Sequence, residues 1–170
     1  MPTYSFHPMT EEYASMICSW KYDHPYSIYS MDGSEECISE LMNEEYFYAL
    51  DDRGELTGYL CCGNAARVPG GYAINLYNNN KYLDIGLGLK PDFTGKGNGL
   101  EFLTQGIGFL KKSYKVQHFQ LVVAAFNERA MKVYERAGFI KGPCFMSKVG
   151  DQEIEFVAMN YSTAEGTSTE

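Results

Sequence analysis

Residues 83–99, LDIGLGLKPDFTGKGNG, decide the fold of this chain. They begin within a strand-like segment, 82–89, and end in a glycine-rich turn, 95–99. After the turn, apolar side chains repeat at helical spacing, as Leu100, Leu103, Ile107 and Leu110. Because glycine has no Cβ, successive N–H groups of such a turn can point inward, and the helix start adds free donors and the positive end of its dipole. The stretch therefore predicts a strand, a cradle for a phosphate or pyrophosphate, and a helix.

Two common nucleotide-binding motifs do not fit this turn. A dinucleotide fingerprint needs a third glycine where the chain has Leu100, and a P-loop needs Ser or Thr where Gly97 follows Lys96. One alternative is a turn that only connects the strand to the helix. Another is a plain nucleotide-binding α/β domain.

The other expected elements alternate around this centre. Upstream we expect a strand, two helices separated by a tyrosine-rich loop, and a hairpin, at residues 3–7, 10–20, 35–43, 46–50 and 56–63, with the loop at 21–33. Downstream we expect a central strand, a helix from Asn127 to Gly138 and two final strands, the strands at residues 119–126, 139–148 and 153–160. The order β-α-α-β-β-β-α-β-α-β-β predicts an α/β fold with a mixed sheet flanked by helices.

Length and composition indicate one globular domain. Of the 170 residues, 45% are apolar and 21% are charged, which excludes a disordered, collagen-like or coiled-coil chain. We assign residues 1–161 to the domain and residues 162–170, STAEGTSTE, to a disordered tail. No apolar run approaches the roughly 18 residues of a membrane span, and the first residues lack the pattern of a secretion signal. We therefore expect a cytoplasmic protein with no membrane partner.

The charge and the cysteines narrow the function further. A net charge of −8 argues against a nucleic-acid partner, because phosphates need a basic surface. An acidic surface suits a cationic substrate such as an amine, and solubility alone also explains it. With no CxxC spacing and distant histidines, we expect neither a zinc site nor a disulfide framework. Most cysteines should be small core residues in a reducing compartment; they are Cys18, Cys37, Cys61, Cys62 and Cys144.

Two segments carry a resemblance to a known family. Residues 94–99, TGKGNG, resemble the acyl-CoA pyrophosphate turn of the GNAT family of N-acetyltransferases, Q/R-x-x-G-x-G/A. Residues 127–139, NERAMKVYERAGF, resemble that family's second motif, N-x-x-A-x-x-x-Y-x-x-x-G-F. Both lie in the expected order with a strand between them, and the element order over about residues 3–160 agrees with this fold. Thr94 stands where the family usually has Gln or Arg, so it receives no side-chain role.

The resemblance implies acetyl-CoA as a co-substrate, with no metal. The backbone of Leu87 and Leu89 would pair with the pantetheine arm like an added strand. Asn127 can both cap its helix and bind the cofactor. The implied cofactor-binding residues are Leu87, Gly88, Leu89, Thr94, Gly95, Lys96, Gly97, Asn98, Gly99, Leu100, Asn127 and Ala130.

The implied chemistry is direct attack of a primary amine on the acetyl thioester. Tyr134 matches the family's general acid, since a phenol is protonated at neutral pH; the alternative is a core tyrosine. Asp84 is our candidate general base, because it shares one strand face with Gly86 and Gly88. The alternatives are a carboxylate that faces water at a strand edge, and a water chain with no dedicated base.

The loop between the first two helices should supply the acceptor pocket. We expect Trp20 and Tyr29 to contact the amine and Asp32 to provide a counter-charge. The alternative is that these aromatic side chains fill the core. The acceptor is a small amine, a protein N-terminus or a lysine, and the enzyme a monomer or a homodimer. A rival function is a non-catalytic acyl-CoA sensor with the same fold.

Overall fold

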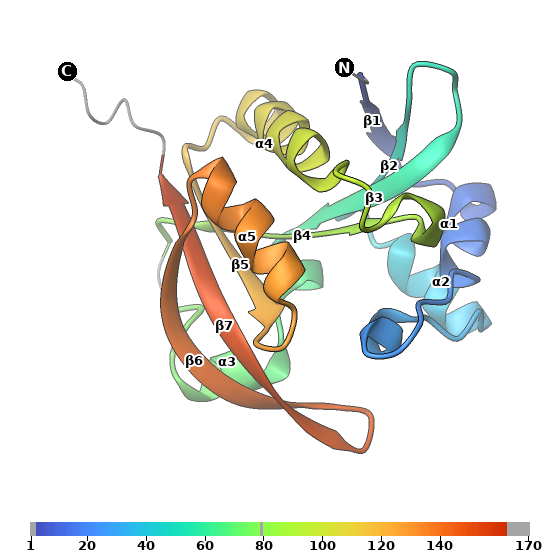
Figure 1. The fold of residues 1–170 in the computed structure, drawn as a ribbon. Coiled ribbons are helices and arrows are strands. Elements are labelled where there is room, and N and C mark those ends of the chain that lie inside the picture. Colours follow the sequence, from blue (N-terminus) through green and yellow to red (C-terminus); the bar gives the residue numbers. More distant parts are fainter. Residues whose placement is uncertain (1–2, 79, 163–170) are drawn as a thin grey trace.

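The computed structural model describes residues 3–78 and 80–162. A seven-stranded mixed sheet forms its centre, with the strand order β1-β2-β3-β4-β5-β7-β6 (Figure 1). Neighbouring strands are antiparallel except β4 and β5, which are parallel. The strands are β1 (Ser5–Pro8), β2 (Tyr46–Leu50), β3 (Leu56–Cys62), β4 (Leu83–Leu89), β5 (His118–Ala124), β6 (Ile140–Val149) and β7 (Gln152–Ser162).

Helical segments connect the strands and cover the sheet. The α-helices are α1 (Glu11–Cys18), α2 (Glu35–Leu41), α3 (Pro69–Ala73), α4 (Gly99–Tyr114) and α5 (Glu128–Ala137). Short 3-10 helices are η1 (Tyr26–Tyr29), η2 (Gly63–Ala66) and η3 (Pro91–Phe93).

The predicted mixed sheet flanked by helices is confirmed, with an addition. The sequence predicts no helix between residues 63 and 82, but Pro69 begins the short helix α3. A proline fits this first helical position because its missing N–H would have no partner there. Ser162, which we assigned to the tail, ends β7 opposite His118, and residues 163–170 lie outside the described residues.

The predicted capping residues explain where three of the helices begin. The side chains of Thr10, Ser34 and Asn127 each accept a hydrogen bond from the backbone N–H three residues later. Gly138, with a φ of 111°, ends α5 in the left-handed region. The helices α1 and α2 end earlier than predicted, at residues 18 and 41.

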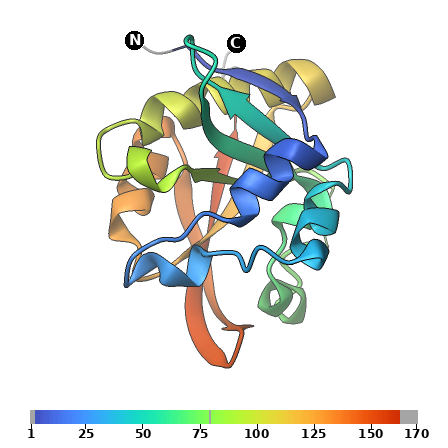
Figure 2. The ribbon, with the colours of Figure 1, turned by 90° about the vertical axis from the view of Figure 1, so that its right-hand side faces the viewer.

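The side chains of β4 alternate between two cores. Ile85 is buried with Leu103 in the core beneath α4 and α5. On the opposite face, a Cβ at Gly88 would overlap the ring of Tyr59, which packs in the core beneath α1 and α2. Figure 2 shows α1 in front of β2 and β3 and α4 behind them. The strand that decides the fold therefore lies between two packed layers.

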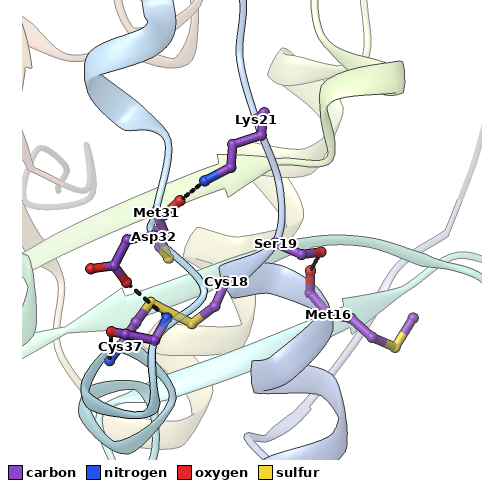
Figure 3. Close-up of a disulfide and its surroundings, with 8 residues drawn as sticks. Met16, Cys18, Ser19, Lys21, Met31, Asp32 and Cys37 are labelled. Atoms are coloured by element: carbon purple, nitrogen blue, oxygen red, sulfur yellow. Dashed lines mark hydrogen bonds between the residues drawn. A yellow bond between two sulfur atoms is a disulfide. The ribbon is translucent and has the colours of Figure 1, made fainter.

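The cysteines differ from the prediction. Cys18 at the end of α1 and Cys37 in the first turn of α2 form a disulfide, with their Cα atoms 6.4 Å apart (Figure 3). The two residues meet because α1 and α2 pack against each other, which their spacing of 19 residues does not reveal. Cys61 and Cys62 are buried as expected, whereas Cys144 is exposed.

Candidate active site

The parallel strands β4 and β5 separate soon after they begin. Their register pairs only Leu83 with Phe119 and Asp84 with Gln120. Beyond these pairs the two strands diverge, which Figure 1 shows at the centre of the sheet. The second half of β4 therefore has its β5-facing side open to a gap.

The register with β3 shows which backbone groups of β4 face this gap. Leu89 lies opposite Gly58, and the N–H of Lys90 donates to the carbonyl of Thr57 at 2.8 Å. In an antiparallel ladder this bond makes Leu89 and Gly58 a non-hydrogen-bonded pair, so the N–H and C=O of Leu89 point away from β3. By alternation, the N–H and C=O of Leu87 do the same. An extended ligand could pair with these groups as an added strand.

The glycine-rich turn follows η3 and leads into α4. Gly95 and Gly97 have φ values of 71° and 83°, which favour glycine. The Thr94 hydroxyl donates to the carbonyl of Pro91 at 2.8 Å, and the Asn98 amide donates to the carbonyl of Phe93 at 3.0 Å. These two side chains hold the turn in place, so it can offer an anion the backbone N–H groups at the start of α4.

A cation from α5 lies over the turn. A Cβ on Gly95 would lie 2.9 Å from Nη1 of Arg129, so the guanidinium group occupies the space that this glycine leaves. The same guanidinium lies 4.3 Å from the ring centre of Tyr26. Lys96 of the turn is exposed. The turn thus combines backbone donors at the start of α4 with the guanidinium of Arg129, and both kinds of group can bind a phosphate.

Tyr134 on α5 has the properties of a proton donor. Its ring lies 6.0 Å from that of Phe139, and it is close enough to Tyr29 and Tyr59 to interact electrostatically. Burial, with a smaller contribution from Tyr29, raises the pKa of Tyr134 above its ordinary value. Tyr59 packs against Gly88 of β4, so Tyr134 is linked to this strand through Tyr59.

Asp84 is buried and both of its oxygens accept hydrogen bonds. Its Oδ2 lies 2.9 Å from Nε of Arg67, and its Oδ1 accepts from Nε2 of Gln120 at 2.8 Å. The Arg67 guanidinium also lies 4.8 Å from the ring centre of Tyr77. A carboxylate that faces water at a strand edge is therefore wrong, since β4 is internal and Asp84 is only 6% exposed.

The expected acceptor residues occupy different places. The Tyr29 hydroxyl accepts from the Asn127 amide at 3.2 Å, which joins η1 to the start of α5. Trp20 is only 8% exposed and packs in the core, its ring centre 6.4 Å from that of Tyr59. Asp32 is exposed beside the disulfide and accepts from the N–H of Ser34 at 2.9 Å (Figure 3). This hydrogen bond lowers the pKa of the Asp32 carboxyl.

The model of the Acetyltransferase (GNAT) family matches residues 10–139 of the chain. The chain belongs to this family. The match contains the glycine-rich turn and the helix of Tyr134, so the resemblance drawn from these two segments is confirmed.

Individual GNAT proteins resemble the chain to different extents. A mycothiol acetyltransferase of Propionibacterium freudenreichii subsp. shermanii is 45% identical over 53 residues, which are 31% of this chain and 17% of that protein. A GNAT acetyltransferase structure from Bacillus anthracis has a TM-score of 0.71 at 13% identity and covers 94% of both chains. A chimera of the spermidine N-acetyltransferase SpeG from Vibrio cholerae and hSSAT has a TM-score of 0.69 at 14% identity, covering 95% of this chain and 96% of its own. These structures establish the GNAT fold.

Three polar side chains of the candidate site were not predicted from the sequence. Arg129 had a signal, since it lies two residues after Asn127 within the second motif and in the first turn of α5. Arg67 and Gln120 had none, because only the fold brings them to Asp84.

Within residues 3–78 and 80–162, no three His, Cys, Asp or Glu side chains are arranged to hold a metal ion. In the same ranges no helix has the length and hydrophobicity needed to cross a membrane.

Proposed function

We propose that this protein transfers the acetyl group of acetyl-CoA directly to a primary amine. The observation that carries the proposal is the gap between β4 and β5. Backbone groups of Leu87 and Leu89 face this gap, and the glycine-rich turn lies at its β4 end. Tyr134 lies near Tyr59, whose ring packs against Gly88 of the same strand. The acceptor is a small amine, a protein N-terminus or a lysine. The names of a spermidine N-acetyltransferase and a mycothiol acetyltransferase among the similar proteins support acetyl transfer.

The chain's residues suit each part of acetyl-CoA. The N–H groups of residues 95–100 and the guanidinium of Arg129 would hold the pyrophosphate. The backbone of Leu87 and Leu89 would pair with the amides of the pantetheine arm. With Leu87 facing the gap, its N–H is a candidate donor to the oxyanion that forms when the thioester is attacked. We assign no metal to the reaction.

The acceptor amine must lose a proton to attack. A lysine-like amine with a pKa of about 10.4 is only about 0.1% neutral near pH 7.4, so a proton acceptor is useful. Asp84 is our candidate, held in place by Arg67 and Gln120. A water chain is the alternative, because both carboxylate oxygens already accept a hydrogen bond.

The leaving group needs a proton in return. As the new C–N bond forms and the C–S bond breaks, Tyr134 donates its phenolic proton to the departing sulfur. Its raised pKa keeps that proton in place before the reaction. The nitrogen of the addition product loses its proton to Asp84 or to water. Exchange with solvent then removes that proton and reprotonates the Tyr134 phenolate, which restores both side chains.

The proposal is tested first by isothermal titration with acetyl-CoA. Free-thiol release is then measured against polyamines, aminoglycosides, amino acids and N-terminal peptides. Saturable binding with amine-dependent thiol release supports the transferase. Binding without release from any amine favours the acyl-CoA sensor, and no binding at all overturns both. Cytoplasmic location and a monomeric or dimeric state remain predictions.

A further inference from the structure

One side chain from the acceptor region reaches the cofactor strand. The Tyr22 hydroxyl donates to the backbone carbonyl of Leu89 at 2.6 Å across 67 residues of sequence. Burial raises the pKa of Tyr22 to about 12, so the hydroxyl remains a donor at neutral pH. Tyr22 lies in the segment between α1 and α2 that also carries Tyr29.

The segment around Tyr22 is folded on itself, so the residue is held in place. The N–H of Tyr22 donates to the hydroxyl of Ser30 at 2.8 Å, and Lys21 donates to the carbonyl of Met31. These two cross-links close residues 21–31 into a compact loop. The Tyr22 hydroxyl is therefore a contact that joins this loop to β4.

The carbonyl that Tyr22 uses is one that the register directs into the gap. Leu89 forms a non-hydrogen-bonded pair with Gly58, so its C=O faces away from β3, on the side where an added strand would pair. An amide N–H of an extended ligand and the Tyr22 hydroxyl would approach the same oxygen, and the phenol ring must lie beside the path of the ligand.

We propose that Tyr22 and the pantetheine arm of acetyl-CoA compete for the Leu89 carbonyl. Binding of the arm then displaces the Tyr22 hydroxyl, and the loop 21–31 loosens with it. Cofactor binding would in this way be linked to the position of Tyr29 in the acceptor region. This inference rests on the proposed function, because it requires that acetyl-CoA binds along β4.

The test compares acetyl-CoA with 3′-phospho-ADP, which has the nucleotide and pyrophosphate but lacks the arm. Both ligands are titrated into the wild type, Tyr22→Phe and the matched control Tyr13→Phe. Tyr13 lies in α1, and its ring stacks on that of Tyr48. Tyr22→Phe should bind acetyl-CoA about threefold to tenfold more tightly, the range expected when one neutral hydrogen bond no longer has to be broken. Binding of 3′-phospho-ADP should be unchanged, and Tyr13→Phe should match the wild type with both ligands.

The outcomes separate the two proposals. Equal or weaker acetyl-CoA binding by Tyr22→Phe overturns the competition, whereas a wild type that does not bind acetyl-CoA overturns the proposed function itself. Hydrogen exchange of the wild type gives a measurement that does not depend on the variant folding. Acetyl-CoA should speed amide exchange in residues 21–31 and 3′-phospho-ADP should not; equal or slower exchange with acetyl-CoA overturns the inference.

Discussion

The two parts of the proposed site, the cofactor region and the acceptor region, are built differently. The cofactor region runs through consecutive elements, from β4 through the turn, α4 and β5 to α5, and offers mainly backbone groups. The acceptor region is held against the cofactor region by side chains that reach across long stretches of sequence. Tyr29 and Asn127 are 98 residues apart, and Tyr22 and Leu89 are 67 residues apart. Binding of a ligand by backbone groups needs a glycine-rich turn and a strand, and both leave a pattern in the sequence. Contacts between side chains that are far apart in the sequence leave no such pattern.

The largest effect should come from Tyr134, the chemical group of the cofactor region. Tyr134→Phe should lower kcat by about 1,000-fold, within the range for loss of a general acid, and leave the Kd for acetyl-CoA within about twofold. Because the pKa of Tyr134 is raised, the wild type should lose no activity from its ionisation up to about pH 10. Steady-state kinetics with the best amine of the panel, and isothermal titration, measure the two quantities.

Tyr48→Phe is the matched control, since Tyr48 stacks on Tyr13 and His7 outside the gap. An unchanged kcat for Tyr134→Phe would remove the phenol from the mechanism. Protonation of the departing sulfur would then fall to solvent.

The predictability of the fold follows the same division. Gly138 ends a helix and Asn127 begins one through contacts within a few residues, so both were visible in the sequence. The Cys18–Cys37 disulfide and the Arg67–Asp84 pair depend on how whole elements pack. Trp20, predicted to line the acceptor pocket, lies in the core. The sequence did not decide between the two places, because an aromatic residue after a helix is compatible with both.

Loss of the disulfide should weaken binding of the amine in the acceptor region and change binding of acetyl-CoA little. Cys37→Ser opens a loop with a sequence separation of 19, and the chain-entropy model gives a loss of about 3 kcal/mol in the free energy of unfolding. The KM for the amine should rise, while the Kd for acetyl-CoA stays within about twofold. Urea unfolding without reductant and isothermal titration test both statements.

Cys144→Ser is the control, because Cys144 is exposed and free. Reductant should bring the wild type to the stability of Cys37→Ser and leave the variant unaffected. If the wild type and Cys37→Ser unfold at the same urea concentration without reductant, the cross-link does not stabilise the acceptor region.

Arg129 tests whether the cofactor region relies on backbone groups alone. Arg129→Gln removes the charge over Gly95 and should raise the Kd for acetyl-CoA about tenfold, as for a charge-assisted hydrogen bond. Titrations at two salt concentrations should show a weaker salt dependence in the variant. Arg136→Gln, in the exposed last turn of α5, should behave as the wild type. Equal affinities for both variants would leave the turn as a purely backbone cradle.

The smallest effect should come from Asp32, which is exposed rather than held against the gap. Its pKa is lowered by the hydrogen bond from Ser34, so the carboxylate is ionised at neutral pH. Asp32→Asn should therefore raise the KM for a cationic amine about twofold at low salt, and added salt should abolish the difference. Asp23→Asn, an exposed charge in the same segment, is the control. If both variants raise the KM equally, the acidic surface as a whole attracts the amine. If only Asp32→Asn raises it, the acceptor region has a counter-charge at this one position.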